Sequence, residues 1–305
     1  MVFIGREGCG DHRREILAGR TMPLNADRRY RLFNLLPEGM PVTKAWLMNR
    51  LNLSRHAVDN LLKSRQLEPV AQAVYMRPGT RLNCEGTVAA LQTIFGLGLN
   101  PGGLTALELQ GFAHYLPLSR RRVVDLYGHD AVPKWLATRL PDVDFVRRLP
   151  LPGLGVEGLI NFAYDAQQRV LCRPLFGKRA EAWPFSLSSP ERAFLEVLRD
   201  VPETISFEHA DQILQAMTTL SSGRMEKLLQ RCTNVKVRRL FYWMAERHPY
   251  PNFRKIAPPE TPDALGLGRG NRMVARGGRL EPEYMITVPE EMATSRTSTI
   301  DKPGC

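Results

Sequence analysis

The sequence contains no two cysteines at the spacing of a metal-binding or redox motif. Its five cysteines are widely separated, odd in number and never arranged as C-x-x-C. This distribution favours neither a disulfide framework nor a zinc site, and it fits a reducing compartment such as the cytoplasm. The cysteines are Cys9, Cys84, Cys172, Cys232 and Cys305. We therefore expect a cytoplasmic protein without a structural metal.

Long apolar runs are missing as well. No run approaches the roughly 18 residues that a membrane-spanning helix needs, and the N-terminal MVFIGREGCG lacks the apolar region of a signal peptide. Residues 1–21 are polar and show no periodicity, which predicts a disordered leader or a wrongly assigned start, with Met22 as the alternative start. The polar residues 290–305 predict a flexible tail. We expect no contact with a membrane.

The motifs of common enzyme classes are absent. The chain has no G-x-x-x-x-G-K-[ST], G-x-S-x-G or H-E-x-x-H sequence. His129 and Asp130 are neighbours in sequence, and neighbours rarely converge on one proton. None of the acids near the middle of the chain sits in the E-x-K step of a metal-dependent nuclease. These acids are Asp142, Asp144, Glu157 and Asp165. We expect no enzyme, no catalytic residue, no metal and no cofactor, with a metal-dependent nuclease as the less favoured alternative.

Acidic residues are outnumbered by basic ones. The chain has 42 Lys and Arg against 31 Asp and Glu, a formal net charge of +11. Residues 22–80 are denser in positive charge, because nine basic side chains there oppose four acidic ones and leave +5. The nine are Arg28, Arg29, Arg31, Lys44, Arg50, Arg55, Lys63, Arg65 and Arg77. Such an excess favours a polyanion such as a nucleic acid as the partner.

Three helix signals occur in this basic region. Asn25 is placed to cap a first helix, Thr43 a second and Ser54 a third. Leu53 precedes the third cap, at the spacing that packs it on Val58 as a hydrophobic staple. The third helix therefore turns its apolar residues inward and its polar residues outward.

Two short β runs follow the third helix. Residues 67–70 and 74–77 are joined by three residues with Gln72 at their centre, as in a short hairpin. Three helices and a terminal hairpin are the elements of a winged helix-turn-helix. We assign this domain to residues 22–80.

The remainder of the chain predicts a larger domain over residues 81–289. Helical and strand-like segments alternate at first, and residues 149–153 (LPLPG) suggest a sub-boundary near residue 150. Ser189 and Pro190 then open a mainly helical part. The expected fold class is α+β, with an N-terminal winged helix-turn-helix followed by a mixed α/β domain that has a helical C-terminal part.

The exposed face of the third helix predicts a DNA interface. In a helix-turn-helix, the second helix of the pair enters the major groove with its N-terminal residues leading. The predicted base-reading residues are Arg55, His56, Asp59 and Asn60. The predicted contacts to the DNA backbone are Lys44, Arg50, Ser54, Lys63, Arg65 and Arg77, and Gln72 lies at the tip of the wing. Two alternatives remain: Asp59 orients Arg55 or Lys63, or the whole winged helix binds a protein while its basic face is solvated.

Two long stretches resemble a known family. The order YRLFNLLPEGMPVTKAWL, then LNLSRHAVDNLLKSRQLEPVAQAVY, is similar to the N-terminal domain of AbiEi-type antitoxins of type IV toxin–antitoxin systems. The segments LSSPERAFLEVL, CTNVKVRRLF and GGRLEPEYMITVP resemble that family's C-terminal domain. The resemblance covers roughly residues 25–289.

The resemblance implies a bacterial cytoplasmic protein of abortive infection, a form of phage defence. It implies a winged helix that represses its own operon by binding inverted repeats, with two copies on the DNA. It also implies a C-terminal domain that counters a nucleotidyltransferase-type toxin without necessarily binding it. The alternative is a DNA-binding regulator without a toxin partner.

A second basic region lies in residues 223–255, where nine basic residues oppose two acidic ones and leave +7. Helical spacing places Val237, Leu240 and Phe241 in the core and predicts that Lys236, Arg239 and Arg247 project elsewhere, with Arg238 at the flank. The predicted antitoxicity or accessory patch is Lys236, Arg238, Arg239 and Arg247. It serves DNA flanking the operator, the toxin's nucleic-acid substrate or an acidic protein surface, or it is only a solvated face.

Overall fold

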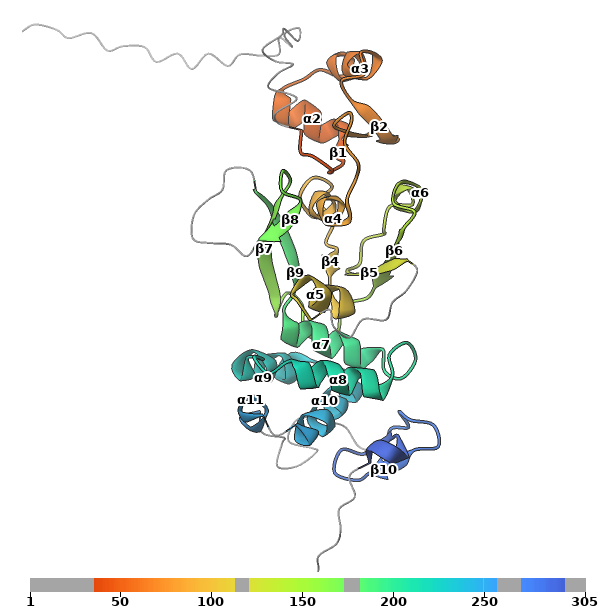
Figure 1. Ribbon diagram of the computed structural model, residues 1–305, viewed down its shortest axis with the longest axis vertical. Coiled ribbons are helices and arrows are strands. Elements are labelled where there is room, and N and C mark those ends of the chain that lie inside the picture. Colours follow the sequence, from red (N-terminus) through yellow and green to blue (C-terminus); the bar gives the residue numbers. More distant parts are fainter. Residues whose placement is uncertain (1–35, 113–120, 173–181, 249, 257–269, 294–305) are drawn as a thin grey trace, which may run out of the picture.

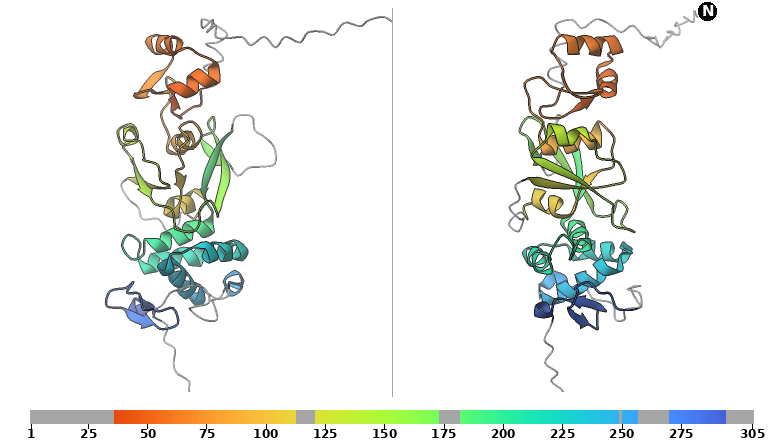
Figure 2. Two further views of the ribbon diagram at one scale, coloured as in Figure 1. Left: turned by 180° about the vertical axis from the view of Figure 1, so that it is seen from behind. Right: turned by 90° about the vertical axis from the view of Figure 1, so that its right-hand side faces the viewer.

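A computed structural model of the chain describes residues 36–112, 121–172, 182–248, 250–256 and 270–293. The described elements are stacked along one long axis (Figures 1 and 2). A small head with α2 and α3 forms one end, two small sheets surround α4 and α5 in the middle, and a group of helices followed by the strand β10 forms the other end. The protein has an α+β fold, as predicted. The predicted leader, first helix and flexible tail lie wholly or mainly outside the described residues.

The head, residues 36–76, contains the predicted helix pair and hairpin. Its antiparallel sheet has the strand order β1-β3-β2, and a two-residue turn joins β2 to β3. The elements are β1 (Val42–Thr43), α2 (Lys44–Leu51), α3 (Arg55–Lys63), β2 (Glu68–Ala71) and β3 (Val74–Met76).

Local capping sets the bounds of the two helices. Thr43 Oγ1 accepts a hydrogen bond from Trp46 N at 3.1 Å, and Ser54 Oγ accepts one from Ala57 N at 3.1 Å. Asn52 ends α2 in the left-handed conformation, with φ of 49°, which asparagine tolerates better than most residues. The predicted caps at Thr43 and Ser54 are confirmed.

The middle module, residues 83–188, consists of two three-stranded sheets. In the first sheet β5 pairs in parallel with β6 and antiparallel with β4, and in the second sheet β7 lies between β8 and β9. The elements are α4 (Cys84–Thr93), β4 (Asn100–Pro101), α5 (Gly103–Leu109), β5 (Arg122–Tyr127), α6 (Trp135–Arg139), β6 (Val143–Arg148), β7 (Leu159–Asp165), β8 (Val170–Cys172) and β9 (Ala182–Ser188).

The side chain of Gln92 joins the two sheets. Its Nε2 donates to Leu99 O at 2.9 Å and to Ser186 O at 2.8 Å, and its Oε1 accepts from Ser186 N at 2.9 Å. One amide therefore bonds the backbone beside β4 to the backbone of β9. The chain before and after residue 150 consequently contributes to one module.

The far end of the molecule is helical and carries a small hairpin. Its elements are α7 (Pro190–Arg199), α8 (Phe207–Ala216), α9 (Ser222–Arg231), α10 (Val235–Arg247), α11 (Pro251–Arg254), β10 (Arg279–Glu281), β11 (Ile286–Val288) and η2 (Glu290–Met292). Val237, Leu240 and Phe241 of α10 are each 0% exposed, which confirms the predicted core face of this helix. Within the described parts of the chain, no helix is both long and apolar enough to cross a membrane.

Candidate nucleic-acid interface

Helix α3 has one face in the core of the head and one face in solvent. Val58 and Leu61 are 0% and 2% exposed and pack with residues of α2 and β3. His56, Asn60 and Lys63 are exposed and follow one another at the spacing of a single helical stripe, opposite Val58. Burial of one face therefore fixes the direction in which the other presents its polar groups.

Arg55 and Ser54 lie at the N-terminus of α3, the end that leads into a groove in a helix-turn-helix. Arg55 is exposed. Ser54 already uses its hydroxyl oxygen to cap the helix, although that hydroxyl can still donate its proton. Thus Arg55, His56 and Asn60, three of the four predicted base-reading residues, are free to meet another molecule.

Asp59, the fourth predicted base-reading residue, forms an ion pair with Lys44. Lys44 Nζ donates to Asp59 Oδ1 at 2.5 Å, from the first residue of α2 to the middle of α3. This hydrogen bond is the main cause that lowers the pKa of Asp59. The pair connects the two helices, so a predicted phosphate contact and a predicted base contact are engaged with each other.

Four other cations surround α3 and are exposed. Among the described residues they have no carboxylate partner, so their charges are available to an external anion. They are Arg50, Arg55, Lys63 and Arg65. Arg77, by contrast, lies 3.0 Å from Glu38 and is only partly exposed. The head thus keeps a positive surface around the outer face of α3.

The predicted patch on α10 is not a continuous surface. Lys236 Nζ donates to Arg199 O at 2.6 Å and to Val201 O at 2.7 Å. Arg247 is partly buried and lies 3.3 Å from Asp211. The helix is covered on several sides, and these long side chains satisfy carbonyl and carboxylate groups of neighbouring segments.

The prediction that Arg239 projects away from the core is wrong. Arg239 is 1% exposed, and its Nη1 donates to Gly270 O and Met285 O, both at 2.9 Å. Arg238 is also buried, with 6% exposure. The physical reason is that the C-terminal hairpin and the segment before it pack over this face of α10 and present the carbonyl oxygens of Met285 and Gly270 to it. No local pattern in the sequence of α10 signals that cover.

Three of the acids considered for a nuclease each have a different partner and do not converge on one site. Asp144 pairs with Arg121 at 3.0 Å, Glu157 with Arg231 at 3.6 Å, and Asp165 accepts from the backbone of its own turn. Asp130, which was considered with His129 as a catalytic pair, accepts from Gly98 N at 2.7 Å. In the described ranges, no three His, Cys, Asp or Glu side chains are grouped so as to hold a metal ion.

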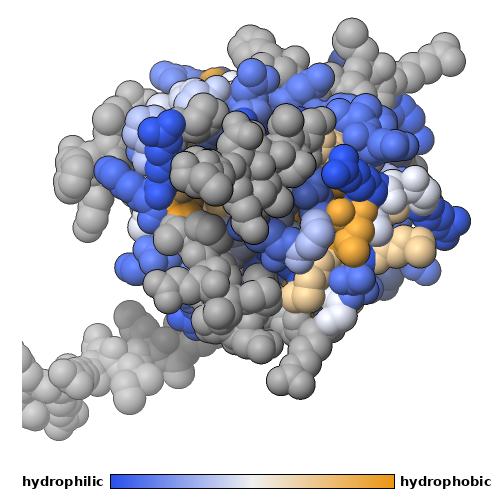
Figure 3. All heavy atoms as spheres, turned by 90° about the horizontal axis from the view of Figure 1, so that it is seen from below, coloured by the Kyte–Doolittle hydropathy of each residue, from blue (hydrophilic) through white to orange (hydrophobic). Residues whose placement is uncertain are grey.

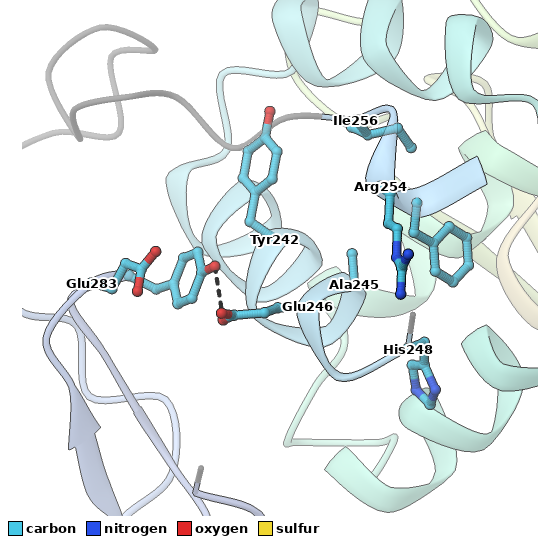
Figure 4. Close-up of a pocket in the computed structure, with 9 residues that line it drawn as sticks. Tyr242, Ala245, Glu246, His248, Arg254, Ile256 and Glu283 are labelled. Carbon is cyan, nitrogen blue, oxygen red and sulfur yellow. Dashed lines mark hydrogen bonds between the residues drawn. The ribbon is translucent and has the colours of Figure 1, made fainter. Parts of the chain in front are cut away.

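A pocket of about 370 Å³ lies at the other end of the molecule (Figure 4). Tyr242 and Glu246 of α10 line it together with Tyr284, whose hydroxyl donates to Glu246 Oε2 at 3.1 Å. Viewed from this end, the described residues that are visible are mostly hydrophilic, with small apolar areas between them (Figure 3). Met273, which is 76% exposed, is an apolar side chain on the segment before β10.

Comparisons with known proteins bear on both parts of the chain. Residues 26–118 match the family model described as "Transcriptional regulator, AbiEi antitoxin N-terminal domain", and residues 160–289 match "Transcriptional regulator, AbiEi antitoxin, Type IV TA system". The RV2827C protein from Mycobacterium tuberculosis has a crystal structure with a TM-score of 0.49 to this chain. It is 16% identical, and the match covers 88% of this chain and 92% of that one. No curated protein matches the chain. The two family models span the head, part of the middle module and the helical end, and the chain belongs to the AbiEi antitoxin family of type IV toxin–antitoxin transcriptional regulators.

Proposed function

We propose that the protein represses its own operon by placing α3 in the major groove of an inverted-repeat operator, with one copy on each arm. The observation that carries this proposal is the arrangement of α3. Its apolar face is buried in the core, and Arg55, His56 and Asn60 lie on the exposed side, near cations that have no carboxylate partner among the described residues. The family's description as transcriptional regulators supports the same reading.

The proposed contacts follow from the donor and acceptor groups of each residue. The guanidinium of Arg55 fits guanine O6 and N7, and the amide of Asn60 fits adenine N6 and N7. Arg50, Lys63 and Arg65 contact phosphates, which position the protein without reading sequence. His56 lies at the N-terminal end of the stripe, next to Arg55, and offers a ring nitrogen to a base edge.

Lys44 and Asp59 have a supporting role in this proposal. Because their ion pair spans from the start of α2 to the middle of α3, it holds the angle between the two helices. The pair is only partly buried, which allows Lys44 to approach a phosphate when DNA is bound. Asp59 stands on the flank of α3 that faces α2, away from the centre of the stripe.

We further propose that the protein acts as the antitoxin against a nucleotidyltransferase-type toxin encoded beside it. The support is the family description, which names a type IV toxin–antitoxin system. The surface for this activity is expected outside α3, so repression and antitoxicity should separate by mutation.

Replacing Asn60 with alanine is expected to weaken binding to the promoter fragment of the operon by about 1–3 kcal/mol, because one bidentate base contact is lost. An electrophoretic mobility-shift titration with the full chain measures this loss. The same variant should derepress a promoter fusion while still protecting cells that express the neighbouring toxin gene.

Asn271→Ala is the matched control, because Asn271 is an exposed asparagine at the opposite end of the molecule. It should bind the promoter fragment as the unchanged protein does. Two results would contradict base reading by α3: an Asn60→Ala variant that binds the promoter fragment as tightly as the unchanged protein does, or an unchanged protein that binds promoter and scrambled DNA equally.

A further inference from the structure

Strand β3 of the wing hairpin is buried on both of its faces. Val74, Tyr75 and Met76, the whole of β3, are 6%, 7% and 6% exposed. Successive residues of a strand point to opposite faces. Tyr75 joins the core of the head, whereas Val74 and Met76 belong to a separate cluster with Val70. Strand β3 therefore lies between two apolar layers, whereas Glu68 and Pro69 of β2 stay exposed.

The second layer comes from the middle module. Phe95, which follows α4, and Trp135 of α6 pack against the cluster of Val70, Val74 and Met76. Their rings lie near each other, with centroids 6.1 Å apart. An apolar contact of this kind fixes the hairpin on the module beneath it, because separating them would expose aromatic and aliphatic surface to water.

The edges of the hairpin are covered as well. Strand β3 lies between β1 and β2, so β2 is the strand of the hairpin that has an outer edge. Arg139 of α6 closes that edge: its Nε donates to Val70 O at 2.7 Å and its Nη2 donates to Pro69 O at 3.0 Å. Pro69 has no N–H to offer, which suits an edge strand.

The tip of the hairpin has few exposed side chains that could enter a DNA groove. Only Gln72 and Ala73 are exposed there, and Ala73 O accepts from Lys44 N at 2.9 Å. The tip carries no cation. On the other side of the head, Trp46 of α2 packs on Trp183 of β9, with ring centroids 5.9 Å apart. Figure 1 shows the head above two arms, one ending in α6 and the other formed by β7, β8 and β9.

We propose that the wing is the joint that holds the reading head on the middle module, and that the wing does not enter the minor groove of the operator. Trp135 and Arg139 are then positioning residues, because they affect DNA binding only by holding the head on the middle module. This inference rests on the proposed DNA-binding function and deepens it, because it removes the wing from the DNA-contacting surface.

The DNA arm of the test compares two substitutions in the full chain. Gln72→Glu places a negative charge at the tip of the wing, and it should change affinity for the promoter fragment less than about twofold, whereas a carboxylate set against phosphates would cost about tenfold or more. Asn60→Ala, on α3, should lose affinity in the same titration. A loss of tenfold or more with Gln72→Glu would overturn the inference, since the tip would then lie against DNA.

The second arm needs no DNA, so it separates this inference from the proposed function. Hydrogen–deuterium exchange of the free full chain should rise at least about tenfold in residues 68–76 of the Trp135→Ala variant, while exchange in α10 stays unchanged. The surface variant Arg139→Ala gives the same local result if Trp135→Ala does not fold. Lys134→Ala is the control, because Lys134 is exposed and the described residues offer it no hydrogen bond to the wing.

If the promoter binds, Arg139→Ala should lower its affinity about two- to tenfold, and Arg139→Lys should restore part of it, because lysine can donate to one of the two carbonyls. If hydrogen–deuterium exchange in residues 68–76 remains unchanged in both the Trp135→Ala and the Arg139→Ala variants, the proposed role of the wing as a joint is refuted. Failure of every protein to bind the promoter would instead refute the proposed function.

Discussion

The affinity of the full chain for its operator is expected to fall by about 250- to 1,000-fold when monovalent salt is raised from 50 to 200 mM. Each phosphate neutralised by a lysine or arginine releases condensed counterions, so four to six contacts per copy give a slope of about −4 to −5 in log affinity against log salt. The groups proposed to make these contacts are Arg50, Lys63 and Arg65, which have no carboxylate partner among the described residues, together with Lys44. Fluorescence anisotropy titrations across the salt range measure the slope.

Single substitutions assign the slope to residues. Arg50→Ala, Lys63→Ala and Arg65→Ala should each reduce it by about 1, because each removes one phosphate contact. Lys255→Ala is the matched control, since Lys255 is exposed but lies just after α11, at the helical end of the molecule. A slope flatter than about −2 for the unchanged chain would favour a protein partner for the head over DNA.

Replacing Glu196 with alanine is expected to lower the free energy of unfolding by about 3–5 kcal/mol, because it breaks a buried ion pair. Glu196 is 0% exposed, and its Oε1 accepts from Arg192 Nε at 2.9 Å while its Oε2 accepts from Gly103 N at 2.9 Å. Burial raises the pKa of Glu196, and these hydrogen bonds oppose the rise. Without the carboxylate, the guanidinium of Arg192 stays in the core without its charge partner.

Urea denaturation of the full chain, followed by tryptophan fluorescence, measures this loss. Glu203→Ala is the control, because the Glu203 side chain is 70% exposed, and its removal should change the stability by less than about 0.5 kcal/mol. A loss below about 1 kcal/mol for Glu196→Ala would show that the middle module and α7 do not depend on this pair.

Signals that act over three or four residues were readable from the sequence. Thr43 and Ser54 lie at the starts of apolar helical patterns, and each accepts the hydrogen bond expected of a cap. The core face of α10 follows in the same way, since residues three and four apart share a side of a helix. Such features depend on neighbours in the chain, and neighbours are visible in a sequence.

Contacts between distant segments were not readable in this way. Lys44 and Asp59 are 15 residues apart across a turn, and their pairing depends on how two helices cross. Arg239 meets carbonyls more than 30 residues further along the chain, on a hairpin whose position no pattern in α10 encodes. The place of a charged residue in a helical pattern therefore predicts its exposure only when it is known which other segments pack on the helix.

The burial of the wing could be predicted from the sequence only in part. The run Val74-Tyr75-Met76 has no polar residue, whereas a strand with one face in water alternates apolar and polar side chains. That run was a sequence signal of burial on both faces. What the sequence could not supply was the identity of the cover, because Phe95 and Trp135 come from elements that follow the head.

The most direct test of the account is a DNase I footprint of the full chain on the DNA upstream of its own gene at low ionic strength. The account predicts two protected arms of an inverted repeat, with centres separated by about one helical turn or a multiple of it. Both arms should disappear together in the Asn60→Ala variant at the same concentration. A promoter without any protected base, under conditions in which the protein is folded, would contradict the claim that α3 reads DNA.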